Sequence, residues 1–390
     1  MTIRTPGRVA GIAAALVLIA GLAACSTDAG GAAPADSGAP ADSGAAVDTA
    51  GIETAQAQLD IYYEPPTWQG PDVPVDLTGL EGKRVTYINV SSGIPVLKYW
   101  TDTVKAILDE QAGVILEEVD AKGSVDEANR GFQQAIASGA DLIVLQALSP
   151  ELFATQIADA QAQGIKVITG NTGVPGDVSE GQDAEVSFDY VKIGELIADW
   201  FIVDSEGAGK ATVISSDDVP ASQPQVQATL DRVAELCPQC DVKVEDIQIP
   251  QWETSVPTLV QSTINTDPER TYFLPLYDGQ GLSGLGAIRA AGAGDRVTMG
   301  AFNATPGIVE SLMDPTSGLG LDIGGQNEWW AYAMADQIFR VLQDEEPIEN
   351  YNVGLRIFDR DNAEELIVGE ELDWYGYDGY RDEFLALWGK

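Results

Sequence analysis

Two neighbouring cysteines, Cys237 and Cys240, are the side chains with the most reactive chemistry in the sequence. A CxxC motif acts in thioredoxin-like enzymes when it follows a strand and opens a helix, because the helix N-terminus lowers the thiol pKa. Here the motif follows a pattern typical of a helix and precedes one typical of a strand. It also lacks the second CxxC or the histidines that would complete a zinc site. We therefore expect a local disulfide between Cys237 and Cys240, formed in an oxidising compartment.

The composition removes most hydrolytic chemistry. The sequence contains no His and 61 Asp and Glu residues, so Ser-His-Asp triads, Cys-His pairs and His-ligated metal sites cannot form. A glycosidase would need two carboxylates about 5 to 9 Å apart, and no spacing in the sequence marks such a pair. Asp359-Arg360-Asp361 begins like a calcium loop, but Ala363 occupies the next ligand position and no glycine follows. We expect no metal, no cofactor and no catalysis.

The charge balance argues against anionic partners. The chain has 21 Lys and Arg against 61 Asp and Glu, a formal net charge of −40, which repels phosphate backbones. The sequence also lacks the basic N-terminal helix-turn-helix of a transcription regulator. No nucleic-acid partner is expected.

The first 25 residues have the pattern of an export signal. Arg4 and Arg8 precede an apolar run, 9–24, which is too short for a lasting transmembrane helix and ends in small residues. The sequence Leu-Ala-Ala-Cys that ends at Cys25 resembles a bacterial lipobox, in which the cysteine becomes the lipidated first residue of the mature chain. We expect residues 1–25 to be a lipoprotein signal peptide and Cys25 to anchor the protein on the outer face of the cell membrane. An unmodified cysteine after an ordinary signal is the alternative.

A low-complexity segment follows the signal. Ala-Pro-Ala-Asp-Ser-Gly occurs at 33–38 and again at 39–44, and residues 26 to about 58 include almost no large apolar side chain. Such a composition cannot bury enough surface to fold. We expect residues 26–80 to be a disordered acidic tether.

Short apolar runs alternate with helical patterns along the rest of the chain. Helix boundaries are marked by a capping box at Ser124 and Glu127 and by Gly139 and Gly164 at helix ends. Strands that alternate with helices form a parallel sheet covered on both faces, and the pattern restarts near residue 190. We therefore expect an α/β protein with two doubly wound lobes and a ligand beyond the carboxyl ends of the strands. The expected strands are 85–90, 114–119, 142–145 and 165–168, then 211–215, 242–247, 271–276 and 297–301.

Several segments carry a resemblance to a known family: Ala-Asp-Leu-Ile-Val-Leu at 140–145, Gly-Ile-Lys-Val-Ile-Thr at 164–169 and Phe-Asn-Ala-Thr-Pro at 302–306. With the lipobox, they make the chain resemble the type I periplasmic solute-binding proteins of sugar ABC transporters, particularly the ribose-binding group. The resemblance implies two lobes joined by three crossings, with the ligand held in the cleft and closure by hinge motion. It implies lobe 1 at 81–187 plus 325–350, lobe 2 at 188–322 plus 351–360, and a C-terminal extension at 361–390.

The function implied by this resemblance is ligand capture for transport. An extracytoplasmic, lipid-anchored monomer would bind a small polar ligand, a sugar or polyol, and deliver it to the permease of an ABC importer. A surface lipoprotein that senses the ligand without transport would share every feature above. A carboxylate-based glycosidase is the third alternative.

Family positions also transfer to candidate ligand-binding residues at the strand ends. The family's usual Asn-Pro-Phe-Phe is here Ile-Pro-Val-Leu at 94–97, and its cleft arginine has no counterpart, so a neutral cleft is expected and ribose itself is not. Sugars need flat aromatic rings beside donors and acceptors, and Trp252 falls where the family stacks a ring. Trp252 and Phe302 could instead be core, and Asn171 and Asn303 could be turn residues with left-handed backbone. The candidate set is Ser92, Asn171, Thr172, Asp189, Trp252, Tyr277, Asp278, Phe302 and Asn303.

Overall fold

The computed structural model describes residues 49–365 and 375–390. The expected signal peptide, the lipidation site at Cys25 and the tether up to residue 48 lie outside the described residues. Within the described part, no helix has the length and apolar character needed to cross a membrane.

The first lobe is built on a five-stranded sheet whose strands all run parallel, in the order β2-β1-β3-β4-β5. Its central strand β3 is apolar from Leu142 to Leu145, as expected of a strand with helices on both faces of the sheet, and Ile143 and Val144 are fully buried. The strands are β1 (Arg84–Asn89), β2 (Ile115–Asp120), β3 (Leu142–Gln146), β4 (Lys166–Gly170) and β5 (Ala184–Val186), and the helices are α2 (Pro95–Ala112), α3 (Val125–Ser138), α4 (Ala154–Gln161) and α10 (Asn327–Leu342).

The second lobe contains a six-stranded sheet in the order β11-β10-β9-β8-β6-β7. Only β11 runs antiparallel, against β10; the other pairs are parallel. The strands are β6 (Lys210–Ser215), β7 (Asp241–Asp246), β8 (Tyr272–Pro275), β9 (Thr298–Phe302), β10 (Leu319–Gly325) and β11 (Leu355–Phe358), and the helices are α5 (Tyr190–Asp204), α6 (Ser222–Leu236), α7 (Trp252–Thr266), α8 (Asp278–Ala290) and α9 (Pro306–Met313).

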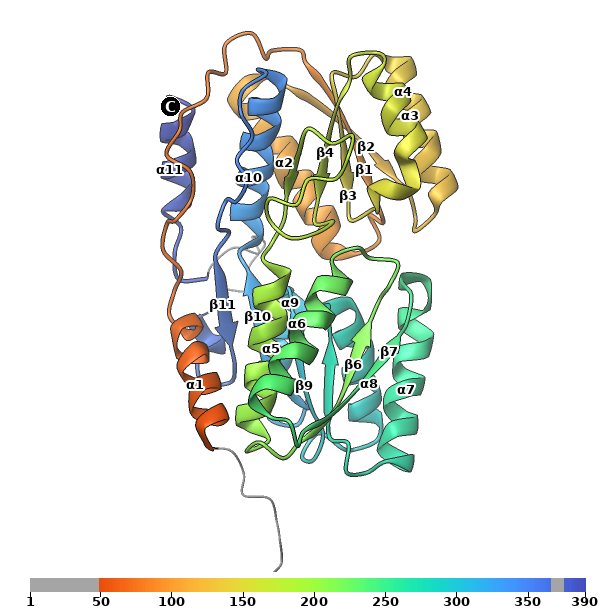
Figure 1. Ribbon diagram of the computed structural model, residues 1–390, viewed down its shortest axis with the longest axis vertical. Coiled ribbons are helices and arrows are strands. Elements are labelled where there is room, and N and C mark those ends of the chain that lie inside the picture. The colour runs from red at the N-terminus through yellow and green to blue at the C-terminus, as the bar shows by residue number, and fades with distance from the viewer. Residues whose placement is uncertain (1–48, 366–374) are drawn as a thin grey trace, which may run out of the picture. The chain divides into compact units, whose positions relative to one another are not determined.

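The chain passes between the lobes from β5 to α5, from β10 to α10 and from α10 to β11 (Figure 1). Helix α10 belongs to the first lobe because it packs against α2 and the β4–β5 edge of the first sheet. The predicted α/β class with two doubly wound, mainly parallel lobes is therefore confirmed.

The local signals in the sequence act as expected at most element ends. The Ser124 hydroxyl accepts the backbone N–H of Glu127 at 3.4 Å at the start of α3, and Gly139 ends that helix with φ 68°. Cys237 and Cys240 are joined by a disulfide with an S–S distance of 2.01 Å, between α6 and β7. Strands β5, β10 and β11 were not expected as strands; β10 reads Leu-Gly-Leu-Asp-Ile-Gly-Gly, and glycine weakens the strand signal.

The prediction of a disordered tether through residue 80 is wrong for residues 49–80. Thr49–Tyr63 forms helix α1, which packs against α5 of the second lobe. Its contact face is made of small residues and one leucine: Ala55 and Leu59 are buried, and a Cβ on Gly51 would lie 2.1 Å from the Leu236 carbonyl oxygen. A search for large apolar side chains misses such a helix because it docks by close backbone approach.

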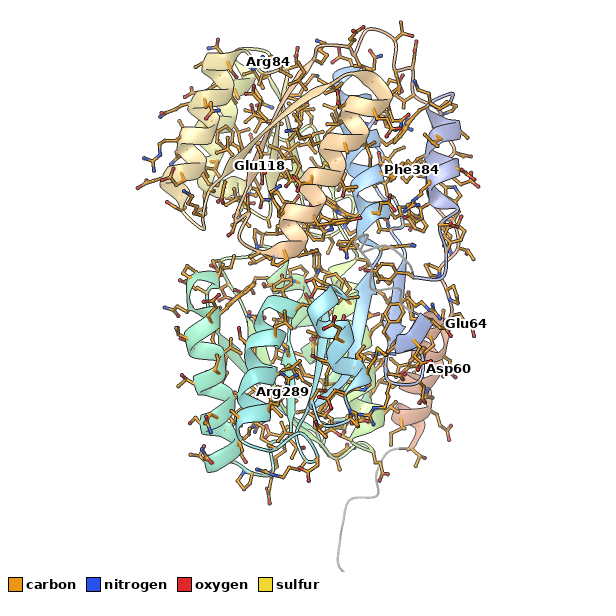
Figure 2. The ribbon with its side chains drawn as sticks, turned by 180° about the vertical axis from the view of Figure 1, so that it is seen from behind. Asp60, Glu64, Arg84, Glu118, Arg289 and Phe384 are labelled. Atoms are coloured by element: carbon orange, nitrogen blue, oxygen red, sulfur yellow. A yellow bond between two sulfur atoms is a disulfide. The ribbon has the colours of Figure 1, made fainter. Side chains whose placement is uncertain are left out.

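Residues 64–80, which we call the strap, run from α1 toward the first lobe and contact the C-terminal helix α11 (Tyr380–Leu387). The Val75 N–H donates to the Leu387 carbonyl at 3.0 Å, and Trp68 stacks on Trp329 of α10 with ring centroids 5.2 Å apart. In Figure 2, Asp60 and Glu64 mark α1 and the start of the strap beside the second lobe, while Phe384 marks α11 beside the first. The strap and α1 therefore form an extra connection between the lobes.

Candidate ligand-binding site

A cavity of about 80 Å³ lies where the carboxyl ends of strands from both sheets meet. In sheets of this kind the loops that follow the strands form the binding site, and these loops supply most of the lining. The lining consists mainly of apolar side chains, with a few polar groups: Val90, Ile94, Pro95, Val96, Leu97, Trp100, Ala147, Asn171, Tyr190, Val219, Ile249, Trp252, Tyr277, Asp278, Gly279, Leu282, Asn303 and Thr305.

Asn171 follows β4 and offers the cavity an amide donor. Its Oδ1 accepts the backbone N–H of Phe188 at 3.3 Å, which fixes the side-chain orientation because a backbone N–H can only donate. Its Nδ2 is buried without a hydrogen-bond partner. Asn171 also has φ 54°, so it is a left-handed turn residue and a site residue at once.

Asn303 occupies the equivalent position after β9. Its φ of 129° and the φ of 51° at Ala304 place two consecutive non-glycine residues in the left-handed half of the map, a strain that usually marks functional loops. The backbone holds this turn: the Asn303 N–H donates to the Ile323 carbonyl at 3.0 Å, and Asn327 Nδ2 donates to the Asn303 carbonyl at 3.1 Å. Asn303 lines the cavity from this turn.

Asp278, the first residue of α8, lines the cavity and is paired with the fully buried Asp322 of β10. One oxygen of each carboxyl accepts a backbone N–H, from Thr305 to Asp278 at 2.7 Å and from Ala304 to Asp322 at 2.8 Å. Burial raises the pKa of Asp278 to about 7. Burial, followed by repulsion from Asp278, also raises the pKa of Asp322. The pair therefore keeps a proton that isolated carboxyls would lose.

Trp252 and Tyr277 form an aromatic side of the cavity. The indole N–H of Trp252 donates to the Ile247 carbonyl at 2.9 Å and to the Ser216 hydroxyl at 3.0 Å. The Tyr277 hydroxyl lies 3.1 Å from the Ser222 hydroxyl. The polar groups of both side chains are thus hydrogen-bonded within the protein, and their aromatic rings line the cavity.

Four of the candidate residues are not brought to the cavity. The Ser92 hydroxyl donates to Glu118, and the Thr172 N–H and hydroxyl both donate to Glu185, at 2.9 and 3.0 Å. Asp189 is exposed and caps α5 by accepting the Lys192 N–H at 2.9 Å. Phe302 is fully buried between Phe188 and Tyr190, which agrees with its alternative assignment to the core.

Sequence reasoning missed six apolar side chains of the lining, which we call the apolar wall. One of these side chains is Trp100, which lines the cavity while its indole N–H donates to Asn327 Oδ1 at 2.8 Å. The available signal was the apolar replacement of the family's Asn-Pro-Phe-Phe at 94–97. The apolar wall consists of Ile94, Leu97, Trp100, Val219, Ile249 and Leu282.

The comparison with protein families decides the assignment. The family model described as a periplasmic binding protein domain matches residues 85–346, which span both sheets except β11. The chain belongs to the periplasmic binding protein domain family. The resemblance inferred from the sequence is thereby confirmed.

Solved structures share the fold of this periplasmic binding protein. A 5-methylthioribose transporter solute-binding protein from Thermotoga lettingae TMO, in complex with 5-methylthioribose, has a TM-score of 0.69 at 16% identity and covers 81% of this chain and 99% of its own. A solute-binding protein from Mycobacterium smegmatis with bound glycerol has a TM-score of 0.66 at 20% identity, covering 75% and 99%. An ABC sugar transporter subunit from Rhodobacter sphaeroides 2.4.1 has a TM-score of 0.66 at 18% identity, covering 73% and 100%. No curated protein matches the chain at a significant level.

The charges around the cavity of this periplasmic binding protein do not favour a charged ligand. Among the described residues, no Lys or Arg lines the cavity, and Asp278 is its one ionisable acid. A carboxylate or phosphate ligand would enter without a partner for its charge, which is unfavourable in a buried site. The geometry therefore fits a neutral solute that is held by amides, an acid and aromatic rings.

Proposed function

We propose that the protein captures a small neutral sugar or polyol in the cavity between its lobes and delivers it to the permease of an ABC importer. The observation that supports this most directly is the convergence of Asn171 from the first sheet with Asp278 and Asn303 from the second on one cavity. A ligand that contacts both lobes favours the closed arrangement by its differential affinity. The solutes named for the related structures, glycerol and 5-methylthioribose, are of this chemical kind.

The same geometry gives little support to catalysis. A glycosidase needs two carboxyls placed on either side of the scissile bond. Asp278 is the one carboxyl among the described residues that line the cavity, and its neighbour Asp322 lies behind it. Reversible binding without turnover is therefore the proposed activity.

The remaining parts of the proposal concern location and partners. A lipid on Cys25 would hold the monomer outside the cytoplasm, and the residues before α1 would tether it within reach of the permease. A sensor without a permease would use the same cavity. If the immobilised, ligand-loaded protein retains the permease, this would support transport. If it does not retain the permease, this would favour sensing.

A thermal-shift screen of the mature domain against pentoses, hexoses, polyols and their derivatives tests the binding proposal. A ligand that binds only the folded state adds RT ln(1 + [L]/Kd), about 2.7 kcal/mol at a hundredfold excess over Kd. The recovered ligand should be chemically unchanged, as judged by mass spectrometry. Failure of every member to raise the melting temperature at millimolar concentration would refute sugar or polyol binding.

A further inference from the structure

The lining of the cavity contains both polar side chains and the apolar wall. We call three of its polar members, Asn171, Asp278 and Asn303, the polar end. The apolar wall faces the same space from both lobes, with Leu97 and Trp100 from α2 and Leu282 from α8. A fully hydroxylated sugar would place hydroxyls against this wall, where each unpaired one weakens binding by about one to two orders of magnitude.

Helix α8 shows how close the two regions are. Asp278 and Leu282 are four residues apart and lie on the same face of the helix, about 6 Å apart along its axis. Asp278 is 1% exposed, whereas Leu282 is 41% exposed although it lines the cavity. A ligand that reaches from the acid to this leucine therefore needs a polar group and an apolar group at about that separation.

Building on the proposed function, we propose that the cognate ligand is a neutral sugar or polyol with an apolar substituent, such as an alkylthio, alkoxy or aryl group. Its hydroxyls bind the polar end, donating to Asp278 and accepting from Asn171 Nδ2, which is buried without a partner. Its substituent covers Leu282 and the rest of the apolar wall. Acidic sugars and sugar phosphates are excluded because no Lys or Arg among the described residues lines the cavity.

Calorimetry with matched ligand pairs tests this inference on the mature chain. The pairs are ribose and 5-methylthioribose, xylose and methyl xyloside, glucose and phenyl glucoside, and glycerol and 1-O-butylglycerol. In at least one pair the substituted member should bind more tightly, by about fourfold for each CH₂ equivalent that it buries. If the parent compounds bind as well as the substituted ones, this inference fails and the proposed function stands. If no member of any pair binds, the proposed function fails.

A variant and its matched control locate the effect. Leu282→Gln should weaken the substituted ligand about tenfold more than it weakens the parent sugar, because the substituent is the part of the ligand that covers this side chain. Leu152→Gln makes the same change at a position that is 60% exposed and outside the cavity, and should alter neither affinity. If Leu282→Gln lowers the affinity for both ligands equally, while Leu152→Gln changes neither affinity, the contact assigned to Leu282 is overturned.

Discussion

Trp252 lies nearly parallel to Tyr277, with ring centroids 6.0 Å apart and 24° between the ring planes. Hydrogen bonds hold the Trp252 ring in this position, because its indole N–H donates to the Ile247 carbonyl and the Ser216 hydroxyl. It also requires Gly279, where a Cβ would lie 2.7 Å from the indole ring. Trp252 is therefore both a core residue, 7% exposed, and a lining residue of the cavity.

This double role predicts different results for two substitutions at Trp252. Trp252→Ala should lower the free energy of unfolding by about 3 to 5 kcal/mol, as for other buried aromatics, and abolish ligand binding with it. Trp252→Phe keeps a ring in the stack but removes the N–H, so it should cost about 1 kcal/mol and retain most of the affinity. Urea unfolding and calorimetry measure the two effects. Full stability of Trp252→Ala would show that the indole is not part of the core.

The Asp278–Asp322 pair predicts a pH-dependent stability. Both pKa values are raised in the folded state, that of Asp278 to about 7, whereas unfolded carboxyls titrate near 3.9. The folded state therefore binds more protons between about pH 4 and 7, and stability falls as pH rises through that window, by at most about 1.4 kcal/mol per pH unit for each proton.

Urea unfolding between pH 4.5 and 7.5 checks this expectation with Asp278→Asn. The amide can still accept from Thr305 and can donate to Asp322, so the variant should show a shallower decline than the natural protein. Asp159→Asn, at an exposed position on α4, is the control and should leave the profile unchanged. An unchanged slope in Asp278→Asn would mean that the pair does not hold the extra proton. Asp199, whose pKa burial raises to about 6 beside Arg232, contributes equally in all three proteins.

The positions of the site's polar groups could be predicted from the sequence, and the apolar wall could not. Asn171, Tyr277, Asp278 and Asn303 lie in the loops or helix starts that follow β4, β8 or β9, and the carboxyl ends of parallel strands converge. Ile94, Leu97 and Leu282 look like ordinary core residues in the sequence. Which of them faces the cleft depends on how the two lobes are placed, which only the tertiary structure shows.

Similar reasoning explains the elements that were missed. Helix α3 is expected between the capping box that begins at Ser124 and the helix end at Gly139, and it is observed as Val125–Ser138, because its apolar residues recur with helical spacing. Helix α1 is also a regular α-helix, but it packs through the small residues Gly51 and Ala55. Its sequence therefore resembles that of the low-complexity segment before it. The sequence also could not identify Asp322 as the partner of Asp278. Asp322 lies on β10, a strand rich in glycine that was not expected as a strand.

Asn171→Asp tests the amide donor at the polar end. The substitution keeps the oxygen that accepts the Phe188 N–H but replaces the unpartnered NH₂ with a second acceptor. Ligand affinity should fall by about tenfold to a hundredfold, the range for a lost hydrogen bond in a buried site. Asn350→Asp, at an exposed position outside the cavity, is the matched control. Retained affinity in Asn171→Asp would remove Asn171 from the binding site.

The last prediction concerns the C-terminal helix. Asp336 of α10 is fully buried, and its carboxylate accepts hydrogen bonds from Arg340 Nε at 2.6 Å, from the Tyr351 hydroxyl at 2.8 Å and from the indole N–H of Trp388 at 2.7 Å. Trp388 thus ties the chain end to a buried charge that water cannot reach. Removing one of its donors leaves the carboxylate under-satisfied, which costs about 1 to 3 kcal/mol.

Trp388→Phe should therefore destabilise the protein by more than the loss of ring volume alone. The matched control is Trp329→Phe on α10, the helix that carries Asp336, because the Trp329 N–H is buried without a hydrogen-bond partner and its removal affects packing only. Equilibrium unfolding in urea should rank Trp388→Phe below Trp329→Phe by about 1 to 3 kcal/mol at neutral pH. Equal losses would mean that the indole bond to Asp336 adds nothing to stability, and that the extension is held by ring stacking, such as Trp388 on Tyr332 with centroids 5.7 Å apart.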